Sequence, residues 1–403
     1  MLELSLVLPE IFISFGIMLL LLVGVFKRNS SILVYNSSII FLIIVLALIL
    51  NHPLEEESFL FNNSYKIDYL SSFMKILTIS SAIFVMLASK KYIQTINIFK
   101  IEYPILLLSS ILGMIVMISS NDLILFYMGL ELQSLALYVL ASFNRDNLLS
   151  TESGVKYFIL SALSSGLLLY GCSLIYGFTG TTNFNLIANN LNSDNYVLTF
   201  GIVFILVGLA FKISAVPFHM WAPDVYQGSP TSITSFFAIL PKIAALTVFI
   251  RFLYVPFINI IDQWQMIIIF LSISSMLFGA IAAIGQKNLK RLIAYSSIGH
   301  MGYALAGLTT GTQAGINSSI LYITIYIFMN LAFFSCLFML KKNDKYYENI
   351  EDLSGLSKNH PLLSLSMMII LFSIKLRRIR NPSRLKSPIC FRFSNIKING
   401  PGS

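Results

Sequence analysis

Residues 196–242 decide the fold, and they read "YVLTFGIVFILVGLAFKISAVPFHMWAPDVYQGSPTSITSFFAILPK". An apolar stretch long enough to enter a membrane carries Lys212, and Pro217 follows five residues later; a second apolar stretch carries Pro241 and Lys242. A charge near the bilayer centre costs about 2.5–3.5 kcal/mol on insertion scales, and a proline interrupts the helical hydrogen bonds beside it. Broken backbone at membrane depth persists only where protein or a water-filled cavity receives the freed groups. The sequence therefore predicts an intramembrane polar path through both lysines, the alternative being lysines that snorkel to the interface.

The composition is that of an integral membrane protein. Of the 403 residues, 56% are hydrophobic and 11% are charged, whereas soluble domains carry about 25% charged residues. The net charge of +9 resides in the tail, because residues 375–403 hold eight basic residues and no acid, which leaves +1 for the body. We therefore expect an all-α, polytopic membrane helix bundle whose partners include the lipid bilayer and protons, and no nucleic acid.

Eleven apolar runs are long enough to span a bilayer, at about 20 residues each. A twelfth run begins at Pro361 and fails at Ile374, so it is only partial. The eleven lie near residues 4–26, 32–50, 69–89, 102–120, 122–142, 155–178, 196–218, 233–255, 263–284, 292–310 and 316–340.

The distribution of Lys and Arg over the loops predicts an N-terminus on the outer side of the membrane. With that orientation the outer loops hold only Lys66 and Arg251, and the inner loops hold fourteen basic residues. Those fourteen are Lys27, Arg28, Lys90, Lys91, Lys100, Arg145, Lys156, Lys287, Lys290, Arg291, Lys341, Lys342, Lys345 and Lys358. The stretch "GQKNLKRLIAYSS", which contains Lys290 and Arg291, is by itself an ordinary inner loop.

One acid, Glu131, lies near the middle of the fifth run. A buried carboxylate needs a partner or must be protonated, and Lys212 is the residue of opposite sign at similar depth. The alternative is a neutral acid that joins helices by hydrogen bonds. Lys75 lies within about two turns of the outer end of its run, so snorkelling explains it.

Two histidines adjoin these polar positions. His300 lies in the tenth run with Ser296, Ser297 and Tyr303 around it, which allows a relay role or a structural one. His219 flanks the predicted helix break, and the sequence allows either a relay role or a structural role for it.

No site for covalent or redox chemistry is evident. Cys172, Cys336 and Cys390 are isolated and lack metal-ligand or disulfide spacing. The chain also lacks a phosphate-binding glycine loop and a haem-ligand histidine pair. We therefore expect that the chain moves something and binds no cofactor itself.

Four stretches resemble the proton-translocating, antiporter-like membrane subunits of respiratory complex I. They are "NDLILFYMGLELQSLALYVLASF", "GVKYFILSALSSGLLLYG", "FKISAVPFHMWAPDVYQGSPT" and "KNLKRLIAYSSIGHMGYALAG". The resemblance covers nine-tenths of the chain, to about Ser373. It implies membrane-arm partners, NADH, FMN, iron–sulfur clusters and quinone held by other subunits, and a bacterial or mitochondrial inner membrane.

The resemblance also implies a fold of fourteen helices with two inverted five-helix repeats and a discontinuous helix near Pro217. On this basis we divide the chain into an N-terminal three-helix segment (1–101), a first repeat (102–257), an incomplete second repeat (258–374) and a basic tail (375–403). Glu131 and Lys212 correspond to the ion pair of the family's proton channel, Lys242 to its connecting lysine, and His300 to its central polar axis; Pro217 and Pro241 mark helix breaks.

The chain departs from the family pattern at its end, "LFSIKLRRIRNPSRLKSPICFRFSNIKINGPGS". The family continues the twelfth helix through a glycine–proline–proline break to another lysine, and Lys375 does not match that motif. A frameshifted or truncated gene is the expected explanation, the alternatives being a sequencing error and a genuine short variant. Two other functions stay open from the sequence: a cation/proton antiporter subunit, and a scaffold subunit that does not pump.

Overall fold

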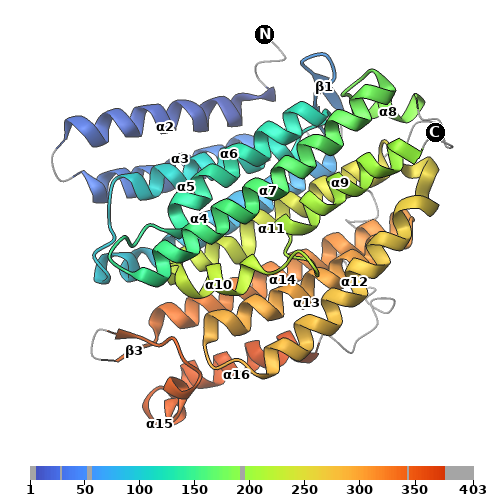
Figure 1. The fold of residues 1–403 in the computed structure, drawn as a ribbon. Helices are drawn as coiled ribbons and strands as arrows, with labels where there is room; N and C mark the ends of the chain where they lie inside the picture. The colour runs from blue at the N-terminus through green and yellow to red at the C-terminus, as the bar shows by residue number, and fades with distance from the viewer. Residues whose placement is uncertain (1–5, 28–29, 52–56, 191–195, 343–344, 377–403) are drawn as a thin grey trace.

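The computed structural model describes residues 6–27, 30–51, 57–190, 196–342 and 345–376. It is a bundle of helices that run back and forth in nearly parallel directions (Figure 1). The helices are α2 Leu8–Phe26, α3 Ser31–Leu50, α4 Tyr69–Thr95, α5 Glu102–Ile118, α6 Leu123–Ala141, α7 Leu148–Thr179, α8 Phe184–Asn189, α9 Tyr196–Lys212, α10 Trp221–Gly228, α11 Thr231–Tyr254, α12 Ile261–Ile284, α13 Leu289–Leu308, α14 Gln313–Met339, α15 Leu356–Asn359 and α16 Pro361–Leu376. Short strands are β1 Ser58–Leu60, β2 Tyr65–Ile67, β3 Lys341–Lys342 and β4 Lys345–Tyr346; 3-10 turns are η1 Ile258–Ile260 and η2 Glu351–Leu353.

Each predicted apolar run forms a helix, and the predicted break falls between α9 and α10. Among the described residues, eight helices are long and apolar enough to cross a membrane, and three shorter apolar helices include α5, most of α9 and part of α16. The prediction of an all-α membrane bundle with a discontinuous helix near Pro217 is confirmed. The predicted helix break at Pro241 is wrong: α11 runs from Thr231 to Tyr254 through that proline, because the carbonyl that it frees accepts a side-chain hydrogen bond instead. The structure adds two antiparallel hairpins, β1–β2 and β3–β4, which the sequence analysis did not expect.

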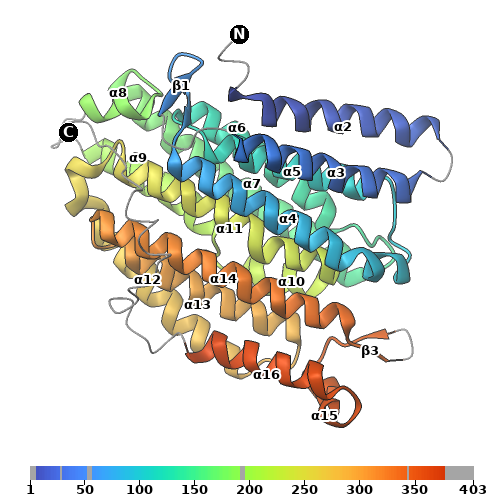
Figure 2. The ribbon, with the colours of Figure 1, turned by 180° about the vertical axis from the view of Figure 1, so that it is seen from behind.

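Helix α11 forms the centre of the bundle. All of its 24 residues are buried, and Figures 1 and 2 show it between the N-terminal helices on one side and α12–α16 on the other. A helix that is apolar on every side belongs in such a position. Lys242 and Arg251 therefore lie in the interior of the protein, because they are on this helix.

Helices α5 and α6 approach each other so closely that glycine is required at their crossing. A Cβ on Gly113 would lie 2.5 Å from the backbone nitrogen of Gln133, and one on Gly129 would lie 2.9 Å from the carbonyl oxygen of Gly113. Small residues at such crossings let two membrane helices pack backbone to backbone. The contact fixes α6, and with it the position of Glu131.

The loops gather at the two ends of the bundle as the predicted topology requires. At the end predicted to be outer, isolated backbone pairings join Tyr65 to Ser120 and Asp122 to Asn183. At the opposite end, Asn288 pairs with the segment after α14. Loops assigned to one side therefore meet in space, although they are far apart in sequence.

Three expectations about single basic residues are wrong. Lys75 does not snorkel: it is only 4% exposed and pairs with Glu10 at 2.7 Å. Arg251 is not a loop residue: it lies on α11, is 2% exposed, and donates from Nη2 to Asp68 Oδ1 at 2.6 Å. Lys290 is not a solvated loop residue but is buried at the start of α13. In each case the partner lies more than fifty residues away, so local sequence could not indicate it.

Helix α16 begins at Pro361, as the partial twelfth run predicts, and ends at Leu376. The basic tail lies almost entirely outside the described residues. The prediction that this tail does not span the membrane therefore stays a prediction.

Candidate functional site

The helix break between α9 and α10 is stabilised by its neighbours. Residues 213–220 are not helical, and the backbone N–H of Val216 donates to Ser275 Oγ at 2.9 Å. Ser274 Oγ donates to the carbonyl of Val216 at 3.1 Å, and Trp221 Nε1 donates to the carbonyl of Phe211 at 2.9 Å. Polar backbone freed by the break is thus bonded inside the protein, which is the condition for broken backbone at membrane depth.

Lys212 is the last residue of α9 and is buried beside this break. Its Nζ donates to Ser161 Oγ of α7 at 2.8 Å, and the hydroxyl of Tyr138 on α6 donates to the same oxygen at 2.7 Å. The Lys212 Nζ also lies 6.0 Å from the centroid of the Tyr138 ring. Three helices therefore build one polar site around the Lys212 ammonium.

Glu131 lies on the same helix as Tyr138, two turns before it. Because residues three, four and seven apart share one helix face, Glu131, Ser134 and Tyr138 form a single polar stripe on α6. Among the described residues, Glu131 and Lys212 make no ion pair within 4.0 Å, and Glu131 Oε1 is buried without a hydrogen-bond partner. The Glu131 charge still acts on Lys212 electrostatically. The structure thus brings the two residues into one site without direct contact.

Lys242 is 1% exposed, and within the described part of the chain its Nζ has no hydrogen-bond acceptor. The ammonium instead lies between two aromatic rings, 5.8 Å from the centroid of Tyr226 on α10 and 5.7 Å from that of Tyr326 on α14. Attraction between a cation and an aromatic face is worth up to about 2 kcal/mol when desolvated. Two such faces hold the Lys242 ammonium in place of an acceptor.

The same two tyrosines bond to the backbone next to Pro241. Proline has no N–H, so the carbonyl of Phe237, four residues earlier, loses its helical partner. The hydroxyl of Tyr226 donates to that carbonyl at 3.2 Å, and the hydroxyl of Tyr326 donates to the carbonyl of Ala238 at 2.9 Å. The proline thus positions both rings around the lysine that follows it.

His300 of α13 packs against Tyr326 of α14, on the ring that also faces Lys242. Its Nδ1 is 2.7 Å from the hydroxyl of Tyr322, and its ring centroid is 5.3 Å from that of Tyr326. The Tyr326 ring therefore contacts both the Lys242 ammonium and the imidazole. His219 is separate from this group: it is buried and packs against Phe278, with ring centroids 4.5 Å apart.

Aromatic side chains fill the space between the two lysine sites. Ring centroids are 5.0 Å apart for Tyr138 and Tyr157, 4.7 Å for Tyr157 and Trp221, and 6.2 Å for Trp221 and Tyr226. Tyr138 belongs to the Lys212 site and Tyr226 to the Lys242 site, so this stack joins the two.

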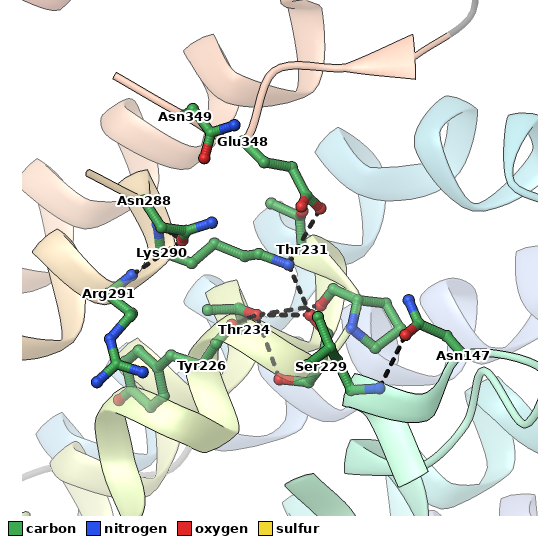
Figure 3. Close-up of polar contacts among 12 residues, drawn as sticks. Asn147, Tyr226, Ser229, Thr231, Thr234, Asn288, Lys290, Arg291, Glu348 and Asn349 are labelled. Carbon is green, nitrogen blue, oxygen red and sulfur yellow. Dashed lines mark hydrogen bonds and ion pairs between the residues drawn. The ribbon is translucent and has the colours of Figure 1, made fainter. Parts of the chain in front are cut away.

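The inner end of α10 is held by charged residues of α7 and α13. Asp224 accepts from Lys156 Nζ at 2.9 Å and from Arg291 Nη1 at 2.8 Å, beside a cavity of about 150 Å³. Burial acts to raise the pKa of Asp224, but Lys156 and Arg291 outweigh it and hold that pKa below its ordinary value. Figure 3 shows Lys290, beside Arg291 at the start of α13, reaching toward Ser229 and Glu348.

Lys290 bonds to the turn that joins α10 to α11. Its Nζ donates to the carbonyl of Ser229 at 3.1 Å and lies 3.3 Å from Glu348. Burial lowers the pKa of Lys290, and Glu348 opposes that shift. Because Tyr226 precedes this turn by one helical turn, Lys290 helps to fix the ring that faces Lys242.

Sequence reasoning named Glu131, Lys212, Lys242 and His300 but missed the residues that surround them. Tyr138, Ser161, Tyr226 and Tyr326 come from four helices, and only their neighbours in the fold give them a role. Among the residues that the structure describes, no group of His, Cys, Asp and Glu side chains is arranged to hold a metal ion.

Comparison with known proteins places the chain among respiratory membrane subunits. Residues 120–375 match the family model described as NADH:quinone oxidoreductase/Mrp antiporter, TM. The chain is 72% identical over 372 residues to NADH-quinone oxidoreductase subunit N of Pelagibacter ubique, covering 92% of this chain and 79% of that protein. It is 51% identical over 381 residues to the subunit N of Bartonella bacilliformis, covering 92% and 78%.

Solved structures show the same fold. A chain of respiratory complex I from Thermus thermophilus with bound aureothin matches with a TM-score of 0.77 and 28% identity, covering 91% of this chain and 78% of that one. A chain of the archaeal membrane-bound sulfane sulfur reductase matches with a TM-score of 0.78 and 23% identity, covering 93% and 81%. At 23% identity, the similarity to the sulfane sulfur reductase chain shows only a shared fold.

Proposed function

The chain belongs to the family of NADH-quinone oxidoreductase subunit N, the antiporter-like, proton-pumping membrane subunits of bacterial complex I, and from this premise we propose that it moves protons through Glu131, Lys212, Lys242 and His300. It is a multi-span inner-membrane subunit of a multi-subunit proton-translocating oxidoreductase. The redox cofactors, namely NADH, flavin, iron–sulfur clusters and quinone, belong in this proposal to other subunits. This chain supplies the path for protons.

The observation that carries the proposal is the environment of Lys242. Its ammonium is buried and faces two aromatic rings, without an acceptor among the described residues. A buried charge without a hydrogen-bonding partner is costly, and releasing the proton relieves that cost. A lysine in such a site exchanges a proton more readily than one held by a carboxylate.

In the proposed mechanism, quinone reduction elsewhere in the complex changes the charge balance along the membrane arm. Weakening the attraction between Glu131 and Lys212 leaves the Lys212 ammonium with the hydroxyl of Ser161 as its acceptor. Lys212 then releases its proton toward Lys242, and Tyr326 places His300 next along the path. Moving one charge against 100 mV requires about 2.3 kcal/mol, which the redox reaction must supply.

The test is proton pumping in inverted membrane vesicles that contain the intact complex. Lys242→Met keeps the size of the side chain and removes its proton, so we expect fewer protons pumped per NADH oxidised. Lys91→Gln, at an exposed site near the inner end of α4, is the matched control for loss of one positive charge and should pump normally. Normal pumping by both Lys242→Met and Lys212→Met would contradict the proposal and favour a scaffold role.

A further inference from the structure

A second buried ion pair lies at the outer end of the bundle, away from the residues of the proposed path. Glu10 of α2 accepts at Oε1 from Lys75 Nζ of α4 at 2.7 Å and from the hydroxyl of Tyr65 at 2.5 Å. Lys75 Nζ also donates to the Tyr65 oxygen at 2.7 Å, which closes a triangle of three polar groups. Glu10, Lys75 and Tyr65 are here called the outer triad.

The outer triad is enclosed but is not saturated with hydrogen bonds. Glu10 is 5% exposed, Lys75 is 4% exposed and Tyr65 is 3% exposed. The second carboxylate oxygen, Glu10 Oε2, is buried and has no partner among the described residues. Ionised carboxylates accept at both oxygens, so Oε2 retains the capacity to bind a proton or a donor.

Other charges near the triad come from the elements packed against it. Arg251 of α11 pairs with Asp68, and Lys66 of β2 lies 3.6 Å from Asp68 and 3.4 Å from the partly exposed Glu57. These two cations and two anions pair with one another, so among the described residues Glu10 and Lys75 form an ion pair only with each other. The position beside the β1–β2 hairpin places the triad next to the outer surface.

The packing of α4 on α11 relates the triad to Lys242. These helices are antiparallel, because Asp68 contacts Arg251 at the outer end while Tyr92 bonds to Thr231 at 3.1 Å at the inner end. Lys75 lies seven residues from Asp68, and Lys242 lies nine residues from Arg251. At 1.5 Å per residue, their Cα atoms are about 10 Å and 14 Å from the same outer contact, so the two lysines differ little in depth.

Buried hydroxyl side chains on α4 and α11 lie above and below the depths of these two lysines. The register places the Cα atom of Thr78 near the level of Lys242, at about 15 Å from the outer contact, that of Ser81 at about 20 Å and that of Thr247 at about 6 Å; all three residues are buried. Each hydroxyl donates to a carbonyl of its own helix, at 2.7 Å, 2.9 Å and 2.8 Å respectively. A donating hydroxyl retains lone pairs that can accept, so these buried residues of α4 and α11 offer proton acceptors inside the bundle.

We propose that the outer triad is a proton-exchange site through which a proton leaving Lys242 along the α4–α11 interface reaches the outer side of the membrane. Glu10 Oε2 takes up the proton while Lys75 and Tyr65 hold Oε1, and the carboxyl group then releases it outward; no other atom is transferred. The inference rests on the proposed function of Lys242. It assigns an exit from Lys242 in addition to the proposed path through His300.

The test separates this role from that of a structural ion pair. Removing one member of a buried pair is destabilising, whereas replacing both members is often neutral, so the double variant Glu10→Gln/Lys75→Met should assemble. We expect it to oxidise NADH normally in the presence of an uncoupler, yet to pump fewer protons per NADH, with a loss no larger than that of Lys242→Met. The matched control, Glu57→Gln/Lys91→Gln, also removes one acid and one base and should pump normally.

The outcomes distinguish the two proposals. Normal pumping by Glu10→Gln/Lys75→Met together with loss in Lys242→Met would overturn the exit site and leave the proposed path intact. Loss in the double variant with normal pumping by Lys242→Met would overturn the Lys242 path, and with it the route from Lys242 to the outer triad. If the double variant does not assemble, Glu10→Asp keeps the charge: it should shift the carboxylic acid band in the NADH-induced infrared difference spectrum, and an unchanged band would overturn the inference.

Discussion

At the scale of single residues, Lys212 and Lys242 each carry a buried ammonium, and different neighbours stabilise it at the two sites. Lys212 donates to a serine hydroxyl and experiences a carboxylate at a distance, whereas Lys242 lies between two aromatic faces. The first arrangement responds to a change of charge at Glu131. The second holds an ammonium between two rings without a hydrogen-bond acceptor among the described residues. This difference suits the proposed order, in which Lys212 releases the proton and Lys242 passes it on.

Glu131 and Lys212 should behave as a coupled pair, although they do not touch. Either residue left alone in a low-dielectric site costs free energy or loses its charge, so Glu131→Gln and Lys212→Met should each reduce protons pumped per NADH. The double variant should lose less than the sum of the two single losses, because each change already disables the same step. Vesicle acidification driven by NADH measures all three variants.

A simple sum of losses in the double variant would show that the residues act independently. Lys212→Arg is the companion test, because a guanidinium stays charged at working pH and cannot release its proton. We expect it to assemble and to pump poorly. Normal pumping by Lys212→Arg would exclude a deprotonating role for Lys212.

At the scale of elements, α11 connects the proposed path to the N-terminal helices. Asp68 caps α4 by accepting from the Ser71 N–H at 2.8 Å, and its Oδ1 also accepts from Arg251 of α11. Burial alone would raise the pKa of Asp68, but Arg251, Lys66 and Ser71 together hold it below its ordinary value. One carboxylate thus starts one helix and fixes the depth of another.

Arg251→Met should destabilise the protein by about 3 kcal/mol, the lower end for breaking a buried pair, because Lys66 still faces Asp68. The folded-state pKa of Asp68 is depressed, so its contribution is complete above the unfolded value of about 3.9 and is lost as pH falls through the folded value. The difference in melting temperature from wild type in detergent should therefore be constant from about pH 8 to pH 5. A difference that already shrinks between pH 7 and pH 5 would contradict this assignment.

The elements follow from the sequence far better than the contacts do. Apolar runs and the break at Pro217 are local properties of the chain, and each produced the expected helix or interruption. The positions of the Tyr226 and Tyr326 rings beside Lys242 were not predictable, because they depend on which helices pack against α11. Lys75 shows the same limit: its partner Glu10 lies sixty-five residues away, within the apolar run near residues 4–26, and nothing local to either residue indicates the pairing.

At the scale of the whole molecule, charged contacts gather at both ends of the bundle, and the interior holds few. The inner end has Asp224 with Lys156 and Arg291, and the outer end has Asp68 with Arg251. Between them lie Glu131, Lys212 and Lys242 at intermediate depth. On the proposed path, a proton that crosses the membrane would pass from the charged groups at one end to those at the other through these few ionisable residues.

The direction of that passage depends on the topology, which can be tested directly. Fourteen basic residues in or beside the predicted inner loops, against two at the predicted outer ends, indicate an N-terminus on the outer side, and the structure groups the loops accordingly. Asn189, exposed on α8, should lie outside, and Gln94, exposed near the end of α4, should lie inside. In a cysteine-free background, an impermeant thiol reagent should label Asn189→Cys in intact cells and Gln94→Cys only in inverted vesicles. The opposite labelling pattern would show that the protein has the reverse orientation in the membrane, and the outer triad would then be a site of proton uptake.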